Sequence, residues 1–153
     1  MSDAGSGIET VATFDPERIR RLIDEARGAG HRFLDRLSEE WLAGINRFCK
    51  PGEALFLLTA PPAVIAVCGV NIDPYSADPG VARLRHLYVL AAWRRHGFGS
   101  RLVRHATEHA AFHSFRRMRL RTASPSAAVF YETLGFRPCV DPSATHERLL
   151  GKP

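Results

Sequence analysis

The segment from Leu87 to Ser100 constrains the fold more than any other part of the chain, because it joins a strand to a helix through a basic turn. The letters Leu-Tyr-Val-Leu are typical of the end of an apolar strand, and Arg-Arg-His-Gly-Phe-Gly follows three residues later. Apolar residues then recur at every fourth position, which predicts an amphipathic helix carrying Phe98, Leu102, Ala106 and Ala110.

This turn has the features of an anion site. The first turn of a helix offers backbone N–H groups without partners, and both the helix dipole and the arginines add positive charge there. Phosphate is the usual anion at such a place. A Cβ at Gly97 or Gly99 would hold phosphate oxygens away from the amides. A tight connection that uses its glycines only for packing remains the alternative.

Two common phosphate-binding patterns do not fit the same turn. The spacing Arg94-x-x-Gly97-x-Gly99 lacks the third glycine of a dinucleotide-binding loop, and no acidic residue follows a second strand at the ribose position. No Gly-Lys-Ser/Thr sequence follows either, as a Walker loop would require. The anion site therefore belongs to another class.

The size and composition indicate one domain. A chain of 153 residues can form a single core, which we place at residues 8–150 after a disordered tail at residues 1–7. No apolar run reaches membrane-spanning length, and the N-terminus lacks the layout of a signal peptide. The three cysteines have no metal-ligand spacing, so we expect reduced thiols in a cytoplasmic protein and no metal.

Hydrophobic periodicity and turn residues predict an order of elements that alternates between strands and helices. We expect helices at 15–28, 38–50, 97–113 and 124–135. We expect strands at 8–14, 54–59, 63–72, 81–90, 117–123, 136–140 and 145–150. The middle pair of strands, separated by Ala60-Pro61-Pro62, is expected to form a hairpin.

Two blocks of the sequence resemble the GNAT family of N-acetyltransferases. The turn described above is similar to the acyl-CoA-binding pattern (Arg/Gln)-x-x-Gly-x-(Gly/Ala), which in that family follows a strand ending in Leu-Tyr-Val. The second block, Phe-Tyr-Glu-x-Leu-Gly-Phe at residues 130–136, is close to the family's later motif. The resemblance covers residues 81–140, and the first half of the chain fits it by length and element order only.

The resemblance implies an α/β (α+β) fold and a set of site residues. The expected GNAT-like fold has a mixed, mainly antiparallel sheet of about seven strands with helices on both faces. Its two central parallel strands, which end at Val89 and Ala123, splay apart, and coenzyme A lies between them. Acetyl-CoA is then the cosubstrate and Tyr131 the acid that protonates the leaving thiolate. The residues expected to bind acetyl-CoA are Leu87, Tyr88, Val89, Arg94, Arg95, His96, Gly97, Phe98, Gly99, Ser100 and Ser124.

The chain departs from the family pattern where relatives often carry a catalytic glutamate. Arg83 and Arg119 stand at those positions, so the general base is unassigned. His86 lies in the right strand, but alternation places it on the face opposite Arg83. A water chain or an acceptor amine of low pKa would need no base. We expect Arg83 and Arg85 to bind a carboxylate or phosphate of the acceptor, since buried strand positions rarely keep unpaired arginines.

The resemblance implies an acetyl-CoA-dependent N-acetyltransferase that acts by direct transfer on a primary amine of a small molecule or peptide. A catalytically weak acyl-CoA-binding sensor or regulatory module is the alternative. Ten arginines lie between residues 83 and 121 against one acid, Glu108, but no nucleic-acid-binding motif accompanies them, so we expect no nucleic-acid partner. Dimers are common in the family. The sequence leaves open the acceptor, the range of acyl groups and the oligomeric state.

Overall fold

One seven-stranded sheet organises residues 5–151, which are the residues that this computed structural model describes. The strand order is β1-β2-β3-β4-β5-β7-β6, and the only parallel neighbours in it are β4 and β5. The expected mixed, mainly antiparallel sheet is therefore confirmed. The strands are β1 Gly7–Thr10, β2 Ala54–Ala60, β3 Ala63–Ile72, β4 Val81–Val89, β5 Arg117–Leu120, β6 Arg137–Asp141 and β7 Ala144–Leu149.

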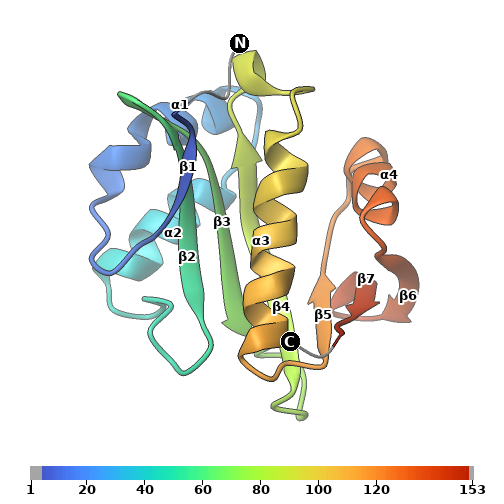
Figure 1. Cartoon of the computed structure of the whole chain (residues 1–153). Coiled ribbons are helices and arrows are strands. Elements are labelled where there is room, and N and C mark those ends of the chain that lie inside the picture. The colour runs from blue at the N-terminus through green and yellow to red at the C-terminus, as the bar shows by residue number, and fades with distance from the viewer. Residues whose placement is uncertain (1–4, 152–153) are drawn as a thin grey trace.

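Helices cover both faces of this sheet, as expected (Figure 1). The helix α3 lies on one face, and α1 and α2 lie on the other. The helix α4 lies beside the end of the sheet formed by β5, β7 and β6. The helical segments are η1 Pro16–Ile19, α1 Arg20–Gly28, α2 Phe33–Leu42, η2 Ala91–Trp93, α3 Phe98–Phe112 and α4 Pro125–Thr133. Across residues 5–151 we find no helix with the length and apolar character that a membrane span requires.

The two central strands separate soon after they meet. Their parallel pairing covers three positions and ends where Arg83 faces Arg119. The strand β4 then continues to Val89, whereas β5 ends at Leu120, short of the predicted Ala123. The edge of β4 that faces β5 is therefore unpaired over its second half within the described chain. This is the splayed arrangement that the resemblance implied.

A β-bulge interrupts the pairing of β3 with β4. The register shifts between Val67 and Gly69 on β3, and His86 on β4 adopts a φ of +61° at this place. A bulge sets two residues of one strand against one residue of its neighbour, so the simple alternation of side chains fails there.

The bulge shows that the sequence prediction for His86 is wrong. The Phe48 ring covers Gly69, where an added Cβ would come within 2.5 Å of it, and Gly69 pairs with Arg85. The His86 ring lies 6.2 Å from that same Phe48 ring. His86 thus shares the α1–α2 face of the sheet with Arg85, and by alternation with Arg83.

The first half of the chain departs from prediction at its second helix. The helix α2 begins at Phe33 rather than Ser38 and ends at Leu42. Its buried stripe starts earlier than expected, at Leu34, which explains the earlier start. Ile45, which lies within the predicted helix 38–50, is 75% exposed in the loop that follows Leu42.

The N-terminal strand is shorter than the predicted 8–14, because β1 ends at Thr10. Residues 1–4 of the predicted tail lie outside the described residues. Of the remaining tail residues, Gly7 pairs with Thr59 in the sheet, and the Ser6 hydroxyl accepts a hydrogen bond from Arg101.

Candidate functional site

The start of α3 presents backbone N–H groups without protein acceptors. Gly97 is the N-cap residue with a φ of +81°, and no side chain within residues 5–151 caps this helix end. Arg101 is the first helical residue whose N–H reaches an acceptor, the Gly97 carbonyl at 3.0 Å. The N–H groups of Phe98, Gly99 and Ser100 have none among the described residues. The side chain of Phe98 is buried, so only its backbone is available for binding.

The two glycines of this turn have different roles. Gly97 requires its glycine for the left-handed backbone, and a Cβ there would meet no atom within 4 Å. A Cβ at Gly99 would contact Phe130 at 3.4 Å and Val89 at 3.5 Å. The first glycine therefore leaves open space for an anion, whereas at the second a Cβ would make ordinary van der Waals contacts with α4 and β4.

The cations of the turn also differ from one another. Arg94 donates through Nε to the Val89 carbonyl at 2.9 Å, and its guanidinium lies 5.1 Å above the centre of the Tyr88 ring. Arg94 is thus held in place by the protein itself. Arg95 has a φ of +65°, and both Arg95 and His96 are exposed at the tip of the turn. Arg95 has no ion-pair partner within residues 5–151.

A carboxylate that the sequence analysis missed connects α1 to this turn. Glu25 Oε1 accepts hydrogen bonds from the Tyr88 hydroxyl at 2.8 Å and from the Ala91 N–H at 2.7 Å. Arg94 Nη2 lies 3.9 Å from the same oxygen. Burial, followed by these contacts with Glu25, raises the pKa of Tyr88 to about 12. Glu25 comes three positions after buried Leu22, so both residues lie on the same side of α1. This spacing could have indicated from the sequence that Glu25 faces the sheet.

The predicted strand edge lies next to the turn. Val89 pairs with Ala66 of β3, and its side chain and that of Leu87 are half-buried. Tyr88 is buried on the α1–α2 side, where its ring lies 6.2 Å from that of Phe33.

Tyr131 lies on α4 in largely apolar surroundings. Its ring centre is 5.2 Å from that of Phe130 and 5.7 Å from that of Phe136. Burial, with a smaller contribution from the Cys68 thiol, raises the pKa of Tyr131 above its ordinary value. The phenol is therefore protonated at neutral pH and can donate a proton.

Ser124 serves as the N-cap of α4. Its hydroxyl accepts from the Ala127 N–H at 3.2 Å and lies 3.0 Å from the Ser126 hydroxyl. The predicted start of this helix at Ser124-Pro125 is confirmed.

Arg83 is not the unpaired arginine that the sequence analysis assumed. Its side chain is buried, and Nη2 donates to the Ser143 carbonyl at 2.7 Å. Nη1 lies 3.6 Å from Oδ1 of buried Asp73, and the guanidinium lies 4.7 Å from the centre of the Tyr75 ring. Burial lowers the pKa of Arg83 from its ordinary value. Arg83 therefore connects the loop after β3 to the turn between β6 and β7.

The remaining strand arginines are held differently. Arg85 is half-buried, has no ion pair within residues 5–151, and forms one long side-chain hydrogen bond there, of 3.5 Å to Asn71 Oδ1. Arg119 forms ion pairs with Asp141 and Glu147, each at 3.4 Å. Arg85 is thus more available to a ligand than Arg83 or Arg119.

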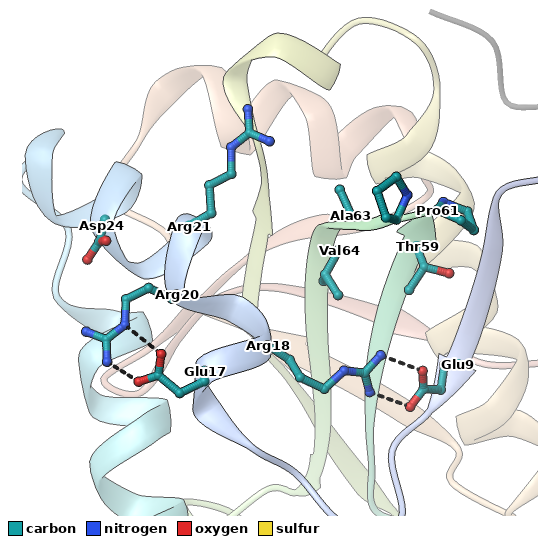
Figure 2. A pocket seen from close by; sticks show the side chains of 11 residues that line it. Glu9, Glu17, Arg18, Arg20, Arg21, Asp24, Thr59, Pro61, Ala63 and Val64 are labelled. Carbon is teal, nitrogen blue, oxygen red and sulfur yellow. Dashed lines mark hydrogen bonds and ion pairs between the residues drawn. The ribbon is translucent and has the colours of Figure 1, made fainter.

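A surface groove of about 790 Å³ lies away from these residues, between β1, α1 and the β2–β3 hairpin. Figure 2 shows its charged side chains, of which Arg18 pairs with Glu9 and Arg20 with Glu17. The groove contains none of the predicted site residues. In the described part of the chain we find no group of three His, Cys, Asp or Glu side chains that could hold a metal ion.

Comparison with known proteins identifies relatives of this fold. A family model described as an acetyltransferase (GNAT) domain matches residues 51–138. A protein from Exiguobacterium sp. 255-15 that is classed as an acetyltransferase superposes with a TM-score of 0.82 at 27% identity, over 93% of this chain and 91% of that one.

Two further solved structures share the fold. N-acetylglutamate synthase from Neisseria gonorrhoeae, complexed with coenzyme A and N-acetylglutamate, gives a TM-score of 0.72 at 16% identity, over 96% of this chain and 35% of that one. The ribosomal-protein-S18-alanine N-acetyltransferase from Escherichia coli gives 0.71 at 15% identity, over 97% and 96%. A comparison with curated proteins found no match.

Proposed function

This chain belongs to the GNAT acetyltransferase family and is an acyltransferase, and we propose that it transfers an acetyl group from acetyl-CoA to a primary amine. The acceptor is a small molecule or a peptide, and transfer is direct within a ternary complex. The observation that carries the proposal is the start of α3, which no side chain among residues 5–151 caps. It lies beside the edge of β4 that faces β5, and this edge has no strand partner beyond Arg83 within the same residues.

The donor is bound by two parts of the site. The free N–H groups of Phe98, Gly99 and Ser100 hold the diphosphate together with the charge of Arg95. The unpaired edge of β4 from Leu87 to Val89 bonds the pantetheine amides in the manner of an added strand, and Ser124 contributes its hydroxyl.

The chemical step uses one group from each side of the opening between β4 and β5. A backbone N–H near Val89 polarises the thioester carbonyl as negative charge develops on its oxygen. Tyr131, which is protonated at neutral pH, gives its proton to the leaving thiolate.

The arginines at positions 83 and 119, where relatives often carry a catalytic glutamate, favour one alternative function, that of an acyl-CoA-binding sensor. Arg83 and Arg119 are both committed to protein partners, and neither can act as a base. A catalytically weak acyl-CoA-binding sensor would have the same donor site without turnover. Thiol release from acetyl-CoA in the presence of an amine library distinguishes the two, because the sensor releases none.

The donor site is tested by replacing Gly97 with alanine. Gly30 provides a matched control, because it also has a positive φ of +87° and open space around its Cβ position. Each substitution strains the backbone by about 1 kcal/mol. Gly97→Ala is expected to weaken coenzyme A binding about tenfold in calorimetry, a difference of about 1.4 kcal/mol, and Gly30→Ala to leave it unchanged. Equal affinities in both variants would refute the donor site.

A further inference from the structure

The helix α4 carries two residues of the proposed site, yet none of its own residues is fully buried. Ser124 is its N-cap, and Tyr131 lies in its last turn. The helix α3, by contrast, buries six residues. The Tyr131 hydroxyl has no hydrogen-bond partner within residues 5–151, so it is not fixed by a contact of its own. The place of this phenol therefore depends on what holds α4 to the sheet.

His146 of β7 holds the last turn of α4. Its Nε2 lies 3.0 Å from Oε2 of Glu132, the residue that follows Tyr131 on α4. A carboxylate accepts hydrogen bonds and an imidazole nitrogen can donate one, so Nε2 carries the hydrogen and donates it to Glu132. The His146 side chain is only 7% exposed, and β7 lies between β5 and β6 in the sheet. The contact thus joins the helix to a fixed point of the sheet.

The other nitrogen of His146 connects it to the N-terminal end of α4. Nδ1 lies 3.0 Å from Thr145 Oγ1, which accepts a hydrogen bond from the Thr122 N–H at 3.0 Å. Thr122 Oγ1 accepts in turn from the N–H of Ser124, the N-cap of α4, at 3.2 Å. The Thr145 hydroxyl is free to donate to Nδ1, so an uncharged imidazole satisfies every member of this chain. Both ends of α4 are therefore connected through β7.

Apolar packing cannot replace these hydrogen bonds. Phe130 and Tyr131 pack against the core as partly buried side chains, and their ring centres lie 5.2 Å apart on the same helix. Burial of apolar surface is non-directional, so such contacts tolerate a small slide or rotation of α4. A hydrogen bond weakens steeply away from its preferred distance and angle. The contact of His146 with Glu132 therefore sets the orientation of the helix.

We propose that His146 is a positioning residue for the acid of the reaction: it holds Glu132, and through α4 it keeps the Tyr131 phenol within reach of the leaving thiolate. This inference rests on the proposed function. His146 itself does not reach the substrate, because it is buried and both of its ring nitrogens contact protein groups. Its effect on the reaction is geometric, and a catalytic group that is misplaced by about 1 Å can cost about 100-fold in rate.

Two variants break the contact from opposite sides, and a third restores it. His146→Leu removes the donor, whereas Glu132→Leu removes the acceptor from a side chain that is 44% exposed and so disturbs folding little. Each is expected to lower kcat about tenfold, measured by thiol release from acetyl-CoA with whichever amine of the library reacts fastest. Coenzyme A affinity should stay within about threefold in calorimetry, because the turn before α3 is intact. His146→Gln, whose amide can donate to Glu132, should recover most of kcat.

A control and a double variant distinguish positioning from a general loss of structure. His109, on α3, contacts the Gly52 carbonyl at 3.1 Å and lies outside the site, so His109→Leu should keep the wild-type kcat. In Tyr131→Phe no phenol remains to be positioned, so adding His146→Leu should lower kcat further by less than about twofold. A further loss as large as in the wild-type background would overturn the proposal, as would equal kcat values in His146→Gln and His146→Leu.

The same assays separate this inference from the proposed function. If no amine of the library releases thiol with the wild-type protein, acetyl transfer is refuted, and the inference is refuted with it. If Tyr131→Phe turns over as fast as the wild type, the acid in the proposed function is wrong. If Tyr131→Phe is slow but His146→Leu and Glu132→Leu keep the wild-type kcat, the inference on His146 fails by itself.

Discussion

Replacing Glu25 with alanine should destabilise the fold and weaken donor binding together, because one carboxylate oxygen connects α1 to β4 and to the turn before α3. The substitution removes the acceptor of the Tyr88 hydroxyl at 2.8 Å and of the Ala91 N–H at 2.7 Å. Hydrogen bonds to a charged group contribute about 1.5–3 kcal/mol each. The Glu25 side chain is 34% exposed, so water replaces part of both bonds. We therefore expect a total loss of about 2–3 kcal/mol.

Urea denaturation of Glu25→Ala measures this loss, and Glu39→Ala is the control because Glu39 is an exposed helical carboxylate on α2. In Glu25→Gln the amide oxygen still accepts both bonds, so about half of the loss should return. Calorimetry with coenzyme A should show weaker binding by Glu25→Ala, since Arg94 also loses the carboxylate beside it. A decrease in the free energy of unfolding of less than about 0.5 kcal/mol would show that the hydrogen bonds of Glu25 to Tyr88 and Ala91 do not stabilise the fold.

Three further predictions concern β4 and α4. Tyr131→Phe should lower kcat about 100-fold or more with little effect on coenzyme A affinity, and unchanged turnover in a stopped assay would remove its acid role. Arg83→Met should lower the free energy of unfolding in urea by about 3 kcal/mol, because it leaves the Asp73 carboxylate buried without its counter-charge. The double variant Arg83→Met/Asp73→Leu should recover most of this loss. Between pH 6.5 and about 3 the unfolded chain binds a proton at His86 that the folded protein does not, so stability should fall on acidification by up to about 1.4 kcal/mol per pH unit. His86→Gln should reduce this dependence of stability on pH, whereas the control His31→Gln, at an exposed histidine, should not. If His86→Gln leaves the pH dependence unchanged, His86 is not the group that causes it.

The second half of the fold was predictable because its signals are local. Ser124-Pro125 and Gly135 mark the two ends of α4, and the four-residue repeat marks α3. The start of α2 was missed because Ser38, followed by two glutamates, has the features of an N-cap, while the actual N-cap, Arg32, makes no capping hydrogen bond through its side chain. Burial of Leu34 against the sheet outweighs that local preference.

The candidate site was predictable only where it depends on the backbone. The anion turn follows from the positions of its glycines, and the structure gives Gly97 the expected open space. The partners of side chains depend on contacts distant in sequence, such as Arg83 with Ser143 and Glu25 with Tyr88. The position of His86 depends on a register shift that leaves no mark in its own strand.

The uncapped start of α3 gives the protein a built-in reporter for its donor. The N–H groups of Phe98, Gly99 and Ser100 have no acceptor among residues 5–151, so a molecule whose phosphate oxygens accept from them stabilises the folded state when it binds. Coenzyme A and its thioesters can therefore be compared by the rise in melting temperature alone, without turnover and without labelled donor. The thioester that raises the melting temperature most is the one that the folded protein binds best.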